Sequence, residues 1–536
     1  MGAITSTGLL LGLVSMASAV QYGYNHVPVR KDSEIVAGAF ENVDDIQLLS
    51  PAFLTPEARL PGFTDGTQGP SSQDDMEEFL ERLVARNDYM KYGTANFTSE
   101  EHRSFPYVHL SASHARCGDS SDKVRVWIQG AVHGNEPAGD EATQALLGKF
   151  DADPKWAASI LDKLELVVLP RYNPDGVFYF QRTLATNLDP NRDHIKLARQ
   201  QTRDIKQLLN TFNPHVVVDM HEYSAYPVFG GKYVHGSDGL FSAAKNLNIN
   251  EGIRKLSEEL FAKNIADDMK SAGLRAEPYV TGSSVSDSSI VADFAEAGTD
   301  ARIGRNAMGL TQAIVFLLEM RGIGIADQEF QRRTAAGLTM LGSIVQTAAD
   351  NAKKVLKTVE DGIDEFIGST DDVVVTDYSE VMIRPFAMVD RENGSVVYPS
   401  VRFASTTPVL ANLTRARPEA YLIPVAWADL AERLRVAGCE VETLDKPFDG
   451  TVEALTVTSA ELDTAYYEGV IRATVTTESK ERELHLPSGS FRVSTRQKNA
   501  GLAMVALEPE NIDSYVSFNI VPVEEGDEYP IFRIMS

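Results

Sequence analysis

Apolar runs alternate with amphipathic segments over residues 72–367, and this alternation predicts an α/β fold. Buried strands are expected at 124–128, 164–169, 216–218 and 313–318, where apolar and β-branched residues follow one another. Helical spacing of apolar positions predicts helices at 138–150, 195–210, 253–272 and 328–355, and another that begins after Ser72. Strands this apolar are buried on both sides, so we expect a mixed central sheet covered by helices on both faces.

The pattern changes near residue 368. Short β-rich runs follow, at 373–375, 381–383, 395–398 and 468–476, separated by turn signals such as Asn393-Gly394. We therefore predict a smaller, mainly β C-terminal domain at 368–536, which packs on the domain at 72–367 and contains no catalytic residue. Residues 20–71 have little periodicity and are expected to form an irregular lead-in.

The first nineteen residues have the features of a secretory signal peptide. Their apolar centre is too short to span a bilayer, and Ala17-Ser18-Ala19 fits a cleavage site after Ala19. Against this, the segment contains no Lys or Arg, and Met1-Gly2 with Ser6 also fits an N-myristoylation pattern. Glycosylation acceptors at Asn96, Asn393 and Asn412 favour the secreted, extracellular interpretation. No later stretch is apolar for the length of a transmembrane helix.

The composition of the chain limits which classes of partner it can bind. A formal net charge of −26 repels nucleic acid phosphates, so we expect no nucleic acid partner. The two cysteines, Cys117 and Cys439, fall in different predicted domains. They either form a disulfide that links the two domains or are two buried thiols. Oligomeric state is not indicated by any of these features.

Candidate chemistry lies where two of the predicted strands end. His133 and Glu136 follow the strand at 124–128 after a break at Gly130, and His221 follows the strand at 216–218. A catalytic zinc takes three such ligands from protein and leaves one position for water. The carboxyl ends of strands in an open α/β sheet are where such sites form.

Further motifs follow in a fixed order: Asn173-Pro174-Asp175-Gly176, Arg182, Asp189-Pro190-Asn191-Arg192-Asp193, His221, and Leu317-Leu318-Glu319-Met320-Arg321-Gly322. Together with His133 and Glu136, this set resembles the zinc metallocarboxypeptidases, the carboxypeptidase A-like (peptidase M14) family, over roughly residues 75–345. The resemblance implies a hydrolase that removes C-terminal residues from peptides or proteins. It also implies one zinc ion per chain, held by His133, Glu136 and His221.

The same resemblance implies a role for four other residues. Glu319 matches the general base that takes a proton from the zinc-activated water, and Arg182 matches the arginine that stabilises the oxyanion. Asn191 and Arg192 match the pair that holds the terminal carboxylate of the substrate. The alternative for Glu319 is an ion pair with Arg321. The alternative for Arg182, Asn191 and Arg192 is an ordinary position on the surface or in a loop. Asp219 either orients a ligand imidazole or pairs with an arginine.

One departure concerns the segment that closes over the substrate. The family usually carries a tyrosine some twenty residues before its base, whereas residues 291–318 contain none, and Tyr279 is the nearest. The segment holds Arg302 and Arg305 instead. Either one of them lines the pocket for the terminal side chain and favours acidic substrates, or at least one is structural.

Two other functions remain as alternatives. The first is a zinc-dependent amidase or deacylase of the same fold, which acts on a non-peptide or cell-wall amide. The second is a binding module without activity. The presence of Asn191 and Arg192 favours the carboxypeptidase over the amidase, and a complete set of ligands and base favours an enzyme over a binding module.

Overall fold

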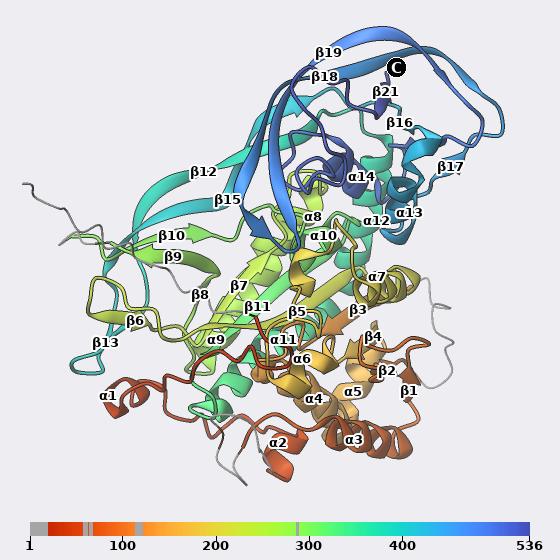
Figure 1. Cartoon of the computed structure of the whole chain (residues 1–536). Helices are drawn as coiled ribbons and strands as arrows, with labels where there is room; N and C mark the ends of the chain where they lie inside the picture. Colours follow the sequence, from red (N-terminus) through yellow and green to blue (C-terminus); the bar gives the residue numbers. More distant parts are fainter. Residues whose placement is uncertain (1–19, 57–62, 64–67, 113–121, 286–288, 536) are drawn as a thin grey trace, which may run out of the picture.

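The computed structural model describes residues 20–56, 63, 68–112, 122–285 and 289–535, and an eight-stranded mixed sheet lies at its centre (Figure 1). Its strand order is β1-β2-β4-β3-β5-β11-β7-β8. The four central strands, from β4 to β11, run parallel to one another, and antiparallel strands extend the sheet beyond β4 and beyond β11. The strands are β1 (Met90–Thr94), β2 (Pro106–Leu110), β3 (Val124–Gln129), β4 (Leu164–Leu169), β5 (Val216–Ser224), β7 (Gly239–Ala243), β8 (Ala276–Pro278) and β11 (Ile314–Ile323).

Helices cover both faces of this sheet, as the sequence predicts. In β5, neighbouring side chains point to opposite faces. A Cβ on Gly139 of α4 would lie 3.0 Å from the Cβ of Met220, and one on Gly304 of α10 would lie 3.0 Å from the carboxylate of Asp219. Helices α4 and α10 therefore pack on opposite faces. The main helices are α3 (Gln73–Arg86), α4 (Pro137–Ala152), α5 (Pro154–Leu161), α7 (Gln200–Phe212), α8 (Glu251–Leu256), α9 (Lys263–Ser271), α10 (Gly304–Gly309), α11 (Phe330–Asp350) and α12 (Ala352–Gly368).

The region after α12 is mainly β. Strands β12 (Val373–Pro385) and β15 (Ser400–Arg415) form a four-stranded sheet with β10 (Ala292–Glu296) and β9 (Val280–Ser284). A six-stranded sheet follows, in which β18 (Phe448–Tyr467) and β19 (Val470–Leu486) make a long hairpin. The remaining elements of this region are β13 (Met388–Asp390), β14 (Val396–Val397), β16 (Ala420–Ile423), α13 (Ala428–Val436), β17 (Glu442–Thr443), β20 (Phe491–Ser494), α14 (Ala500–Leu507) and β21 (Phe532–Ile534).

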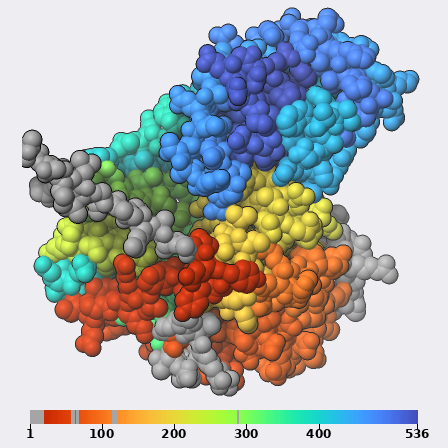
Figure 2. Space-filling view, viewed as in Figure 1, coloured from red at the N-terminus to blue at the C-terminus, as the bar shows by residue number. Residues whose placement is uncertain are grey.

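This C-terminal region packs on the α/β part through a continuous hydrophobic core. The same buried cluster contains Ile128 of β3, Phe316 of β11, Leu310 after α10, and Met504 of α14. Figure 2 shows the C-terminal region as an upper lobe, while the N-terminal lead-in runs across the lower part of the molecule.

Two predicted helices have different bounds in the structure. The helix expected at 195–210 begins only at Gln200, because the carboxylate of Asp193 accepts the N–H groups of Ala198 and Arg199 and shapes a turn there. The helix expected at 328–355 is two helices, α11 and α12, that break at Asn351. Among the described residues, no helix has both the length and the apolar character to cross a bilayer. The predicted signal peptide and Cys117 lie outside the described residues, and Cys439 is buried.

Candidate active site and metal centre

Three neighbouring parallel strands bring the candidate residues together. In the pairing of β5 with β11, His221 lies directly opposite Glu319, and in the pairing of β3 with β5, Asp219 lies opposite Gln129. His133 and Glu136 follow the end of β3. Since parallel strands end at the same edge of a sheet, residues almost 190 positions apart in the chain meet there.

The loop after β3 is shaped by its glycines and a proline. A Cβ on Gly134 would lie 1.9 Å from the backbone carbon of Gly176, so only glycine allows this loop to touch α6 (Pro174–Tyr179). Pro137 occupies the first turn of α4, where its missing N–H costs nothing, and Glu136 is the residue that precedes the helix. The loop therefore presents His133 and Glu136 side by side at the start of α4.

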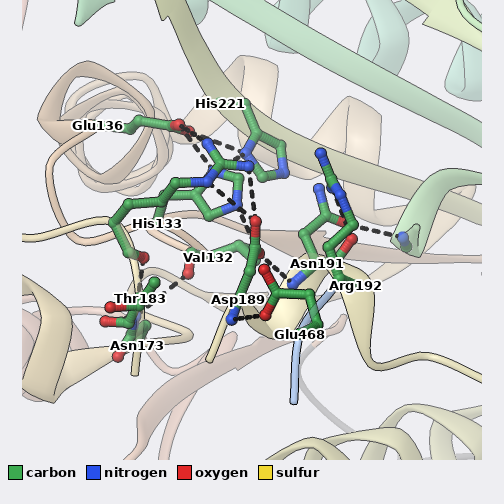
Figure 3. Close-up of polar contacts among 12 residues, drawn as sticks. Val132, His133, Glu136, Asn173, Thr183, Asp189, Asn191, Arg192, His221 and Glu468 are labelled. Carbon is green, nitrogen blue, oxygen red and sulfur yellow. Dashed lines mark hydrogen bonds and ion pairs between the residues drawn. The ribbon is translucent and has the colours of Figure 1, made fainter. Parts of the chain in front are cut away.

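His133, Glu136 and His221 form a compact buried cluster (Figure 3). One ligand atom from each lies within 4.8 Å of the others. The Nδ1 atom of His133 is 2.7 Å from Oε1 of Glu136, the Nδ1 atom of His221 is 2.8 Å from Oε2, and the two Nδ1 atoms are 3.1 Å apart. Among the described residues this is the one cluster of at least three His, Cys, Asp or Glu side chains with such spacing.

In each of the two histidines, a carboxylate also lies close to the other ring nitrogen, Nε2. The Nε2 atom of His133 lies 3.1 Å from Oδ1 of Asp189. The Nε2 atom of His221 lies 3.2 Å from Oδ2 of Asp219, close enough for an ion pair although the N–H is not aligned for a hydrogen bond. Of the two interpretations left open for Asp219, the structure favours the one that orients a ligand imidazole. Carboxylates placed in this way fix the ring orientation of metal-ligating histidines.

The donor set fits a zinc ion. Two ligand atoms that each lie about 2 Å from a tetrahedral metal are roughly 3.3 Å apart, close to the separations in this cluster. Two imidazole nitrogens and a carboxylate that point at one another in a buried space are what a dication would bind. In the metal-free protein, burial pushes the pKa of the Glu136 carboxyl up, but the charges of His133 and His221 hold it well below its usual range.

Glu319 lies beside this cluster without an ion pair to Arg321. The Arg321 guanidinium pairs instead with Asp32 of the lead-in (2.6 Å) and with Glu329 (3.2 Å). Burial raises the pKa of the Glu319 carboxyl to about 8 in the metal-free protein, against the opposing charge of His221. Glu222, next to His221 in sequence, is a structural carboxylate, because Arg333 contacts it at 2.8 Å.

The three other predicted site residues line the same cavity as Glu136 and Glu319, which has a volume of about 430 Å³. The Nε atom of Arg182 donates to Asp189 (2.9 Å), and its Nη1 lies 3.4 Å from Glu136. Asn191 accepts the N–H of Gly304 (2.7 Å). Arg192 makes no ion pair with the part of the chain that the structure describes. A larger cavity of about 830 Å³ lies between α8 and the start of β12, away from all of these residues.

Arg302 and Arg305 differ in their surroundings. Arg302 also lines the cavity, but its guanidinium is paired with Asp513 (2.7 Å) and Asp300 (3.0 Å), so its charge is already balanced. Arg305 is buried and lines the cavity, and one of its nitrogens donates to the carbonyl of Gly298. Its Nε and Nη1 atoms have no hydrogen-bond partner among the described residues. Both atoms are enclosed by protein, so Arg305 contributes a positive charge to the cavity wall and not free donors to the cavity.

For three residues at this site, no role was predicted from the sequence. Asp189 belongs to a quoted motif, but no role was inferred for it. Tyr279 lines the cavity from the connection between β8 and β9, where burial and the charge of Glu319 raise its pKa. Glu468, from the C-terminal region, accepts the backbone N–H of Asp189 at 2.8 Å. Strand connections far apart in sequence bring these residues in, and periodicity gives no signal for that.

The chain is similar in sequence to several known proteins. The profile of the zinc carboxypeptidase family matches residues 76–215. Carboxypeptidase 2 of Trichophyton equinum is 56% identical over 532 residues, which is 98% of each chain, and carboxypeptidase 2 of Trichophyton rubrum is 54% identical over the same share. Among solved structures, a metallo-carboxypeptidase from Pseudomonas aeruginosa aligns with 53% of this chain and 70% of its own, at 17% identity and a TM-score of 0.39.

Proposed function

The chain belongs to the zinc carboxypeptidase family, and from this premise we propose that it is a zinc-dependent metallocarboxypeptidase that removes C-terminal residues from peptides or proteins. Membership makes it a peptide-bond hydrolase. The observation that carries the proposal further is one cavity lined by His133 and Glu136 of the three-residue cluster, by the buried Glu319 and by Arg192.

In this proposal His133, Glu136 and His221 hold one zinc ion per chain. A zinc ion bound there lowers the pKa of water toward neutrality and polarises a substrate carbonyl. Glu319 accepts the proton of the attacking water and returns it to the nitrogen of the leaving amine, a task suited to a buried carboxylate with a raised pKa. Arg182 faces the negative charge that develops on the scissile carbonyl oxygen.

Asn191 and Arg192 would hold the terminal carboxylate of the substrate. A planar guanidinium meets a carboxylate through two parallel hydrogen bonds. Arg192 forms no ion pair with the described residues; its charge acts on nearby Asp189 and Glu468, and its Nη1 donates to the Asn191 carbonyl at 2.8 Å. Such a clamp distinguishes an exopeptidase from the alternative amidase. No structural feature specifically favours the amidase.

We further propose that the protein is secreted and glycosylated, with 72–367 as its catalytic domain and 368–536 as an accessory domain. All three acceptor asparagines, Asn96, Asn393 and Asn412, are exposed, which supports their modification. A chain with a net charge of −26 is not suited to nucleic acid partners.

Chelation tests the metal. Treatment with phenanthroline should abolish peptidase activity, and added zinc should restore it at about one ion per chain, because a catalytic site of this type uses three protein ligands for one ion. Protein carried through the same buffer exchange without chelator is the control. Full activity in protein shown to be metal-free would contradict the proposal.

Substitution of Arg192 tests the carboxylate clamp. For peptides with a free C-terminus, Arg192→Ala should lower kcat/KM roughly tenfold or more, the loss expected for a charge-assisted pair. Arg192→Lys should be intermediate, because lysine keeps the charge but loses the planar fork. Amidated peptides should be poor substrates of every variant. If the wild type cleaves free and amidated peptides equally well, the amidase alternative replaces the carboxypeptidase.

Arg305 indicates which terminal side chain fits. A buried positive charge in a cavity wall attracts a negative group bound in the cavity, because the low dielectric strengthens the interaction. A substrate carboxylate is such a group, and Arg305 lines the same cavity as Arg192. We therefore propose that the enzyme prefers peptides that end in Glu or Asp.

A peptide panel that varies only in its last residue checks this preference. Wild type should favour terminal Glu over Gln by roughly tenfold or more in kcat/KM, because the buried charge of Arg305 attracts the carboxylate of Glu and not the neutral amide of Gln. Arg305→Met, which keeps most of the volume, should remove or reverse the preference. Arg332→Met, at a buried arginine that pairs with Asp238 outside this cavity, is the matched control and should lower Tm while it leaves the Glu-to-Gln ratio unchanged. A wild-type ratio near one would refute the assignment of Arg305.

A further inference from the structure

The tip of the β18–β19 hairpin reaches from the C-terminal region to the active-site loop (Figures 1 and 3). Tyr467 pairs with Val470 to close the hairpin, so Glu468 and Gly469 form a two-residue turn. Both have positive φ, 49° and 82°. Such turns favour Asn-Gly or Asp-Gly, because few side chains adopt the left-handed region at low cost. A glutamate that occupies this position against its preference points to a function for its side chain.

Two hydrogen bonds join Glu468 to the loop that follows Arg182. Its Oε2 atom accepts the backbone N–H of Asp189 at 2.8 Å, and its own carbonyl accepts from Nζ of Lys196 at 2.8 Å. These contacts hold both ends of the segment 189–196, which contains Asn191 and Arg192. The hairpin tip therefore fixes the segment from outside the α/β part.

Asp189 contacts several of the site residues at once. Its carboxylate contacts His133 (3.1 Å) and Arg182 (2.9 Å) and accepts the N–H of Asn191 (2.8 Å). The backbone N–H of the same residue is the donor to Glu468. One residue thus links the hairpin to a proposed metal ligand, to Arg182 and to the turn that carries Arg192.

A separate contact fixes the hairpin tip itself. The Tyr467 ring lies 5.7 Å from the guanidinium carbon of Arg302, measured to the ring centroid, and Arg302 is held by Asp513 at 2.7 Å. Arg472 lies against the same ring at 5.3 Å. A tip held in this way is a rigid support, as a positioned active-site group requires.

We propose that Glu468 is a positioning residue of the carboxylate clamp, so that the C-terminal region completes the active site of the α/β part. This inference rests on the proposed role of Arg192. Without the Glu468 carboxylate, the segment 189–192 loses its backbone support, and Arg192 meets the substrate carboxylate less often in the correct geometry.

Glu468→Asn separates this role from a purely structural one. Asn-Gly is the preferred sequence for this turn, so the hairpin should keep or gain stability, but the shorter side chain does not reach the N–H of Asp189. We expect an equal or higher Tm, a fall in kcat/KM of roughly tenfold for peptides with a free C-terminus, and weaker inhibition by the product amino acid. Glu468→Gln keeps the length and an acceptor oxygen and should lose less. Glu461→Asn, at an exposed position of the same strand, should match the wild type.

A double-mutant cycle with Arg192→Ala decides whether Glu468 acts through the clamp. If it does, Glu468→Asn should cost little more in the Arg192→Ala background, since the contact that it positions is already lost. An equal loss in both backgrounds would overturn the inference, as would unchanged kinetics and product inhibition in Glu468→Asn. Should Glu468→Asn lower Tm, the same cycle run with Glu468→Gln decides. If the wild type fails to distinguish free from amidated peptides, the proposed function itself fails, whatever Glu468 does.

Discussion

The parallel pairing of β3, β5 and β11 is the constraint on which the rest of the site depends. It places His221 directly opposite Glu319 and brings the loop that follows β3 to the same edge. The helices on both faces keep these strands buried. The polar side chains at the ends of the strands therefore form their hydrogen bonds and ion pairs with one another. The lead-in contributes as well, because Asp32 pairs with the buried Arg321 just beyond Glu319 and leaves Glu319 without that partner.

At this edge of the sheet, buried side chains of opposite charge lie next to one another. Asp189 and Asp219 each lie behind one histidine, and Arg182 contacts both Asp189 and Glu136. In the metal-free protein, burial lowers the pKa of His221, but Asp219 and Glu136 outweigh this and hold it well above its ordinary value. Metal binding requires that proton to leave, so the carboxylates that orient the imidazole also make zinc affinity dependent on pH. Arg192 and Arg305 form no ion pair with the described residues, and both line the cavity.

Local patterns were enough to predict the α/β sheet and its four central strands, and the strand ends together with the order of motifs brought His133, Glu136 and His221 forward as one set. Strands β1, β7 and β8 were not predicted. The strand expected at 164–169 has those bounds because its run is apolar except for Glu165 and ends at a turn. The predicted start of α7, at residue 195, was wrong. The side chain of Asp193 accepts the backbone N–H groups of Ala198 and Arg199, which a helix starting there would have used. Tyr279 and Glu468 reach the cavity and its loop through strand connections and a hairpin tip. Their positions depend on tertiary packing, which neither periodicity nor motif spacing records.

The central claim is that zinc binding and proton transfer are carried by different residues of the same strand edge. Glu319→Gln tests it most directly, because the amide keeps the shape of the side chain but does not accept the proton. Zinc content should stay at one ion per chain and KM should change little, while kcat should fall by about 10²–10⁴-fold, the usual contribution of a positioned acid–base group. A Glu319→Gln protein that binds zinc and retains the wild-type kcat would contradict this account.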